Sequence, residues 1–291
     1  MHARLPTILT LCLIVMTASG CAAFLGLERE PPEENEAPLE EVPEEIHELE
    51  QALLGIMHSA DLIPVVEGQE NEDEEDEDEE GQENDNGEIP ELTGGILAPV
   101  LMSEGAPGID GTQTYQHIEE VWSHLESAIM DTLETWDELE PQVSGIVTEE
   151  ELDAFEDTLD GLLLSIVGRN YLDTLQGANT LTRFLPGFMQ PSINHAMAAA
   201  YELKYHARRV VLTSGANRYG ESQSSMMAME QLETTVSDGL TERGAGDTAE
   251  HLSASLEDLR RAVDKEELEL IKANAALVMQ HVVRAIEDLN R

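Results

Sequence analysis

Residues 115–139 read YQHIEEVWSHLESAIMDTLETWDEL, and they carry the strongest helical pattern in the chain. The repeating positions alternate between spacings of three and four residues: Tyr115, Ile118, Trp122, Leu125, Ile129, Thr132, Trp136 and Leu139. Side chains with this spacing share one face of an α-helix, because the helix has about 3.6 residues per turn. The stretch therefore predicts a long amphipathic helix with its apolar face in a core.

The helical period continues to the end of the chain. We expect further helices at about 148–166, 171–184, 192–212, 221–240, 248–263 and 265–289. Thr148 followed by Glu151 matches a capping box at a helix start, and no segment alternates long enough to predict a strand. Short polar or glycine-containing links favour antiparallel neighbours. The prediction is an all-α fold, with an antiparallel bundle of about six helices over residues 112–291.

Charge sets the first limit on function. The 291 residues include 61 acidic and 15 basic side chains, for a formal net charge of -46. Nucleic-acid binding requires a basic face, so a nucleic-acid partner is excluded. The charge is not confined to one segment, because residues 93–291 alone carry a net charge of -21. This composition favours a salty or alkaline habitat, because strong salt screens repulsion between like charges. The alternative is simply an acidic envelope protein whose excess charge lies mainly in its linker.

The acidic residues are densest in the N-terminal part. Residues 67–91 read EGQENEDEEDEDEEGQENDNGEIPE and contain almost no apolar side chain. Self-repulsion in such a run favours an extended, disordered chain. We therefore predict an acidic linker at 21–40 and an acidic disordered linker at 67–111.

One amphipathic helix is predicted between these linkers, over residues 41–66. Its apolar positions follow the helical spacing, with Pro64 ending the pattern: Val42, Ile46, Leu49, Leu53, Ile56 and Ala60. Two placements are open at this point. The helix docks on the C-terminal bundle, or it lies at a membrane interface.

The chain begins with MHARLPTILTLCLIVMTASGC at residues 1–21. A basic residue, Arg4, precedes an apolar run from Leu5 to Met16, and small residues follow. This order is typical of a secretory signal peptide, and the apolar run is too short for an ordinary membrane span. Residues 1–20 are therefore a predicted signal peptide.

Ala18-Ser19-Gly20-Cys21 resembles the lipobox of bacterial lipoproteins. The resemblance implies cleavage before Cys21, acylation of Cys21 with palmitate-like chains, and attachment to the extracytoplasmic face of a membrane. Each buried methylene contributes about 0.8 kcal/mol, so two or three chains form a firm anchor. In these lipoproteins Asp after the Cys favours the inner membrane; here Ala22 and Ala23 favour the outer membrane. The alternative is an ordinary signal peptide with a coincidental Cys.

Two C-terminal stretches carry a second resemblance. Residues 268–289, LELIKANAALVMQHVVRAIEDL, and residues 203–212, LKYHARRVVL, are similar to helical-bundle envelope lipoproteins of unassigned function. The resemblance brings no catalytic motif. The sequence also lacks His-Glu-x-x-His, Gly-x-Ser-x-Gly and phosphate-loop motifs. We therefore expect a lipid-anchored, non-enzymatic binding or assembly module that needs no cofactor and has an envelope protein as its partner.

The alternative function is metal binding in the envelope, with His117, Glu120 and His124 as the candidate ligands. His117 and Glu120 resemble the Gly-x-His-x-x-Glu motif of imelysin-like proteins, envelope helical bundles linked to iron uptake, although Tyr115 replaces the Gly. The two histidines are about 10 Å apart along the helix axis, at about 1.5 Å per residue. That separation is too long for both to bind one ion, although Glu120 could pair with either, and a helix face with ordinary exposed histidines is the interpretation that we favour. For copper, Met226, Met227 and Met229 offer thioethers, and the alternative is packing of Met226 and Met229 in the core.

Overall fold

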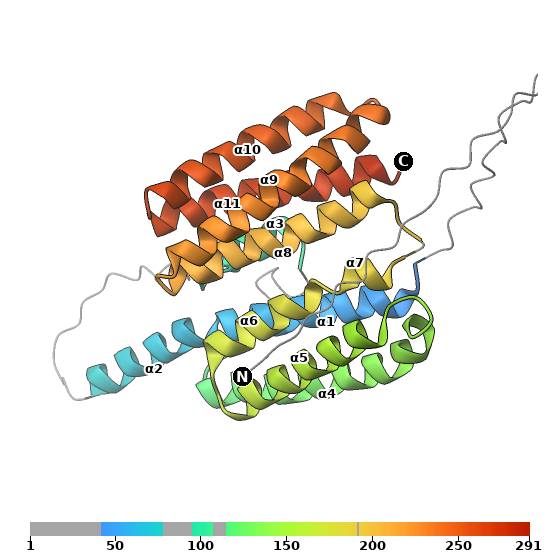
Figure 1. Cartoon of the computed structure of the whole chain (residues 1–291). Coiled ribbons are helices and arrows are strands. Elements are labelled where there is room, and N and C mark those ends of the chain that lie inside the picture. The colour runs from blue at the N-terminus through green and yellow to red at the C-terminus, as the bar shows by residue number, and fades with distance from the viewer. Residues whose placement is uncertain (1–41, 78–94, 107–114, 191) are drawn as a thin grey trace, which may run out of the picture. The chain divides into compact units, whose positions relative to one another are not determined.

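The computed structural model describes residues 42–77, 95–106, 115–190 and 192–291, and in this part of the chain the regular structure is α-helical without strands (Figure 1). The all-α class predicted from the sequence is therefore confirmed. The helices are α1 (Glu44–Asp61), α2 (Ile63–Glu77), α3 (Ala98–Glu104), α4 (Ile118–Val143), α5 (Glu149–Val167), α6 (Tyr171–Thr182), α7 (Leu185–Phe188), α8 (His195–Gly215), α9 (Tyr219–Glu242), α10 (Gly246–Asp264) and α11 (Leu268–Leu289).

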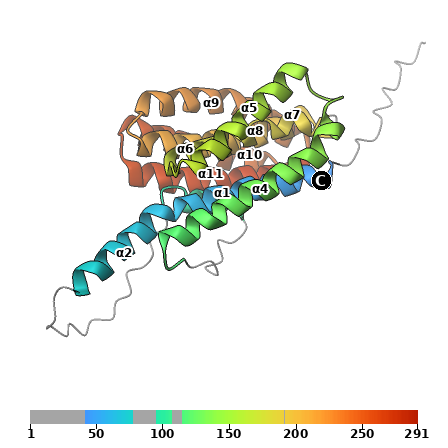
Figure 2. The same ribbon diagram turned by 90° about the horizontal axis from the view of Figure 1, so that it is seen from below.

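Helices α1, α4, α5 and α6 form one four-helix group, in which α1 packs on α4 and α6, and α5 packs on α4 and α6. Figure 2 shows α1 and α4 running side by side. The predicted apolar faces point inward: Leu53 of α1 and Leu125 of α4 are fully buried. The ring centroids of Trp136 and Phe155 lie 4.2 Å apart, and Phe188 of α7 packs against both rings. The predicted capping box of Thr148 is present at the start of α5.

Helices α8 to α11 form the second group, and each one packs on the next along the chain. α11 packs back on α8, which closes the group. The links between these helices span only a few residues, so successive helices run antiparallel. Met226 and Met229 of α9 lie in this core, whereas Met227 is exposed.

Two short elements and α6 connect the groups. α3 packs on α11 and also contacts α1, while α6 and α7 contact α8. Residues 39–291 consequently form one compact unit. The arrangement differs from the expected bundle of about six helices over 112–291, because α1 supplies a core face without which the group of α4, α5 and α6 is incomplete. Of the two placements open for the 41–66 helix, the structure has the docked one.

The predicted disordered linker at 67–111 needs a correction. α2 continues to Glu77, and α3 forms inside the range assigned to the linker. The reason for α3 is the apolar run around it, since Leu97, Val100 and Leu101 are fully buried. Residues 78–94, which hold the rest of the acidic run, lie outside the described residues, as do the predicted signal peptide and the linker at 21–40.

One helical stretch of the described chain, Glu44–Asn71, is long and apolar enough to cross a membrane. However, 67% of its apolar window is buried inside the fold. The core helix of a soluble protein satisfies the same criteria, so this stretch is only weakly compatible with a membrane span.

Candidate functional site

The residue predicted to carry the lipid, Cys21, lies outside the described residues. Acylation of Cys21 and membrane attachment therefore stay predictions.

His117, the first of the predicted metal ligands, lies at the start of α4 and faces α2. Its Nδ1 atom is 3.2 Å from Oε1 of Glu70. The same Glu70 oxygen accepts a hydrogen bond from the backbone N–H of Ile118 at 3.1 Å. Glu70 thus caps α4, because the first N–H groups of a helix have no partner within the helix. Glu70 therefore contacts both the His117 ring and the N-terminus of α4.

The other two predicted ligands make separate contacts. The Glu120 carboxylate accepts a hydrogen bond from the backbone N–H of Gln116 at 2.9 Å. The His124 ring lies 5.9 Å from the ring of Tyr115. Within the described ranges, no group of three or more His, Cys, Asp or Glu side chains is arranged to hold a metal ion. His117, Glu120 and His124 are on one helix but are not brought together around one point.

A buried charge cluster lies where the two helix groups meet. It consists of Glu50 of α1, Glu104 of α3, and Lys204 and Arg208 of α8. The Lys204 ammonium pairs with Glu50 and, at 2.9 Å, with Glu104. Both oxygens of Glu104 lie 2.6 Å from the same terminal nitrogen of Arg208. Two positive and two negative charges therefore share one interior site.

Neighbouring polar groups complete the contacts of Arg208, a side chain only 1% exposed. Its Nε donates to Oδ1 of Asn179 at 2.7 Å, and a terminal nitrogen donates to the Thr182 hydroxyl at 2.7 Å. Both partners belong to α6, so the guanidinium links α3, α6 and α8. Hydrogen-bonded pairing of this kind is what makes a buried charge tolerable.

The charged states of the cluster follow from the pairing. Burial raises the pKa of Glu104, but the positive charges and hydrogen bonds of Arg208 and Lys204 outweigh burial and hold that pKa below its usual value. Burial lowers the pKa of Lys204, but Glu104 and Glu50 outweigh burial and raise it. Glu104 and Lys204 are therefore both charged at neutral pH, and each has an oppositely charged partner in the cluster.

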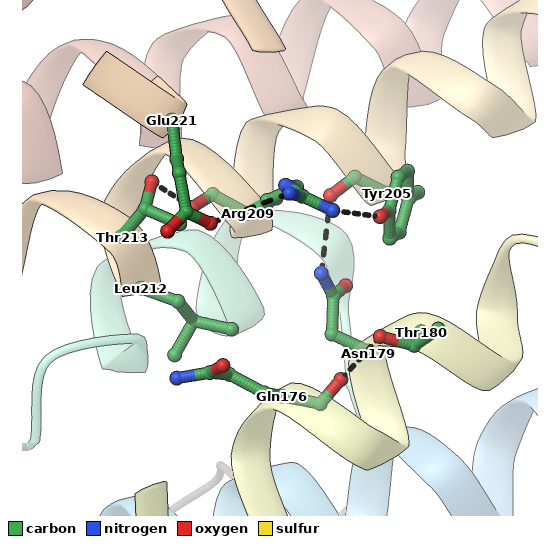
Figure 3. Close-up of a pocket in the computed structure, with 8 residues that line it drawn as sticks. All are labelled: Gln176, Asn179, Thr180, Tyr205, Arg209, Leu212, Thr213 and Glu221. Atoms are coloured by element: carbon green, nitrogen blue, oxygen red, sulfur yellow. Dashed lines mark hydrogen bonds and ion pairs between the residues drawn. The ribbon is translucent and has the colours of Figure 1, made fainter. Parts of the chain in front are cut away.

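A small polar pocket lies beside this cluster, between α6, α8 and α9, and has a volume of about 70 Å³. Figure 3 shows its lining side chains facing one another across the gap between the helices. α6 contributes Gln176, Asn179 and Thr180, α8 contributes Tyr205, Arg209, Leu212 and Thr213, and α9 contributes Glu221.

Arg209 is the central charge of the pocket. One terminal nitrogen donates to the Tyr205 hydroxyl at 2.8 Å, and the other lies 3.4 Å from Oε2 of Glu221. The second Glu221 oxygen is 3.2 Å from Arg218. The side chains of Arg209 and Glu221 are 39% and 42% exposed, so both are open to a ligand from solvent.

Asn179 joins the pocket to the buried cluster. Its Oδ1 accepts from Arg208 inside the protein, and its Nδ2 donates to the backbone oxygen of Tyr205 at 3.3 Å. Both amide atoms are thus committed, which fixes the orientation of the side chain. These hydrogen bonds connect the inner end of the pocket to the charge cluster.

The stretch LKYHARRVVL contained the sequence signal for this site. Lys204 and Arg208 are four residues apart and share a helix face with buried Val211. Basic residues on an apolar face, in a chain with few basic residues, indicate buried pairing. The sequence does not indicate which of the 61 acidic residues are the partners.

Comparisons with protein-family models, with curated proteins and with solved structures gave no match for this chain.

Proposed function

We propose that the protein is a lipid-anchored, extracytoplasmic binding or assembly module without catalytic activity. The observation that carries the binding role is the pocket between α6, α8 and α9. Its side chains offer both donors and acceptors of hydrogen bonds, and Asn179 ties it to a paired, buried charge cluster. The fixed orientation of Asn179 favours binding, because this side chain loses little conformational freedom when a ligand enters.

The anchoring part rests on the lipobox-like residues that end at Cys21, together with the signal peptide at 1–20. Ala22 and Ala23 favour the outer membrane, and the expected partner is another envelope protein. The -21 net charge over residues 93–291 argues against a nucleic-acid partner for the folded part as well.

The anchor is tested with Cys21→Ser, using Cys12→Ser as the matched control inside the signal peptide. Cells are fed labelled palmitate, and membrane and soluble fractions are compared. We expect wild type and Cys12→Ser to carry the label and sediment with membranes, whereas Cys21→Ser does neither. Label retained by Cys21→Ser, or wild type found wholly in the soluble fraction, would contradict the anchor.

The binding role is tested separately by photo-crosslinking in intact cells. A photoreactive residue replaces Gln176 at the pocket, and a control replaces Glu126, an exposed residue of α4. We expect a defined adduct from position 176 that is absent from position 126. Identical adduct patterns at the two positions would contradict a role for this pocket.

Metal binding in the envelope is the second candidate function, and one further contact favours it. The rings of His251 on α10 and His281 on α11 are stacked with centroids 5.6 Å apart. Burial, then the charges of His251 and Arg284, lower the pKa of His281, which favours the neutral imidazole that metals require. Metal analysis of purified wild type, His117→Ala and His281→Ala tests this function. Stoichiometric iron or copper that is lost in one variant supports it, and absence of bound metal in wild type contradicts it.

A further inference from the structure

The pocket between α6, α8 and α9 places a guanidinium and a carboxylate at one small opening. We propose that it binds a small zwitterion, of the class of the smallest α-amino acids, with Arg209 holding the ligand carboxylate and Glu221 holding its ammonium group. This inference rests on the proposed binding role of the same pocket. It does not depend on the lipid anchor.

The size of the pocket restricts the ligand. On the measure that gives this pocket about 70 Å³, a cavity needs about 10–15 Å³ to hold one water, so the pocket has room for roughly five to seven water-sized groups. A carboxylate, one carbon and an ammonium group fill that space. Leu212 is the one apolar side chain in the lining, so a ligand with a large apolar substituent gains little there.

The charges of the pocket favour a ligand with both signs. Arg209 and Glu221 are 3.4 Å apart, whereas a charge-assisted hydrogen bond is usually about 2.7–2.9 Å long. This loose pair can be replaced by two shorter contacts to a zwitterion. Glu221 also pairs with Arg218 at 3.2 Å, so two guanidiniums and one carboxylate meet here. A simple cation would be repelled by the guanidiniums and a simple anion by Glu221, whereas a zwitterion can pair with both Arg209 and Glu221.

Arg209 retains capacity for a ligand while it is held in place. A guanidinium has five N–H donors, and the contacts to Tyr205 and Glu221 described above use two of them. The Tyr205 hydroxyl fixes one edge of the guanidinium. Gln176 and Thr180 line the facing side on α6 and add neutral hydrogen-bonding groups.

The experiment is equilibrium dialysis of the full chain in detergent against radiolabelled glycine. We expect saturable binding of one glycine per chain. Competition with unlabelled acetate, methylammonium and leucine tests separately whether binding requires the ammonium group, the carboxylate and the small size of glycine. Each should compete at least tenfold more weakly than glycine, because each lacks one charge or exceeds the available space.

Three variants that each remove one charge complete the test. Arg209→Gln and Glu221→Gln should each weaken glycine binding at least tenfold. The matched control is Arg260→Gln, since Arg260 on α10 forms a comparable exposed ion pair with Glu230 on α9 at 3.6 Å. The control should bind glycine as wild type does, and all three variants should retain the helical circular dichroism spectrum, because the altered side chains are partly exposed.

Several outcomes overturn the inference. Absence of saturable glycine binding by wild type does so, as does acetate competing equally with glycine. Unchanged glycine binding by Glu221→Gln would show that Glu221 does not hold the ammonium group, and it would contradict a zwitterionic ligand. A failure here together with a specific crosslink at position 176 leaves the proposed binding function intact with a different ligand, so the two failures are distinguishable.

Discussion

Arg208 and Glu104 are 104 residues apart in the sequence, yet one guanidinium nitrogen lies 2.6 Å from both oxygens of the carboxylate. Both side chains are about 1% exposed. The contact fastens the end of α3 to the middle of α8, at the junction of the two helix groups. Its removal should therefore affect the whole folded unit.

Glu104→Gln should destabilise the fold by about 3–5 kcal/mol, because it leaves buried positive charge without its full compensation. The measurement is the free energy of unfolding in urea. Glu119→Gln is the control: it breaks the pair between Arg169 and Glu119, whose side chains are about half exposed or more, and exposed pairs contribute little. Equal effects of the two substitutions would show that the buried cluster is not structurally important.

A fragment that starts at Thr112 should fail to unfold cooperatively, whereas a fragment that starts at Leu39 should unfold in one transition. The shorter fragment lacks α1 and α3, and with them Glu50 and Glu104. Lys204 and Arg208 then have no buried carboxylates to pair with. Urea titrations followed by circular dichroism compare the two, and equal stability would contradict the docking of α1 in the core.

The stability of the fold should depend on the ionisation of Asp61 at the end of α1. Burial raises the pKa of Asp61 from 3.8 to about 6, against the opposing effect of the hydrogen bond from the Leu97 N–H. Since the folded-state pKa is the higher one, this contribution to stability is complete below about pH 4 and is lost as pH rises through about 6.

Asp61→Asn should remove this pH dependence, because the amide stays neutral and its oxygen can still accept from Leu97. The free energy of unfolding of the variant should rise relative to that of wild type as pH rises from 4 to 8. The difference should reach up to about 3 kcal/mol, since one pKa unit equals about 1.4 kcal/mol. Unfolding measured at several pH values checks this. If the free energies of unfolding of variant and wild type changed in parallel with pH, the raised pKa of Asp61 would be contradicted.

Close packing of α9 on α8 should make Gly239 intolerant of a side chain. A Cβ atom at this position would overlap the Cβ of Ala196, which cannot move away by rotation, and would come within 3.2 Å of Leu289. We expect Gly239→Ala to cost about 1–3 kcal/mol. Gly161→Ala is the control: it has open space around it on α5 and should stabilise the helix by about 0.5–1 kcal/mol. If both substitutions changed the free energy of unfolding in the same direction, the close contact between Gly239 and Ala196 would be contradicted.

Added salt should stabilise the fold, because residues 93–291 carry a net charge of -21. Screening shortens the range of repulsion from about 10 Å at 0.1 M to about 3 Å at 1 M. The free energy of unfolding is compared at about 0.1 M and 1 M NaCl. A fold that is no more stable at the higher concentration would contradict the adaptation to salt.

The sequence by itself determined the all-α class and most helices of the C-terminal part. The stripe from Ile118 to Leu139 and the capping box at Thr148 are local features, with every interacting group within a few turns of one helix. Because helical periodicity is a property of neighbouring residues, it can be read without knowing which helices meet. The lipobox-like residues before Cys21 are likewise a local motif.

Only the tertiary structure decided which faces meet. It placed α1 in the core and formed α3 inside a range expected to be a linker. It also selected Glu50 and Glu104, among many similar acidic residues, as the partners of Lys204 and Arg208. The pocket at Arg209 combines side chains of three helices, α6, α8 and α9. Such long-range pairing depends on the simultaneous burial of several helix faces, and no local pattern of residues specifies it.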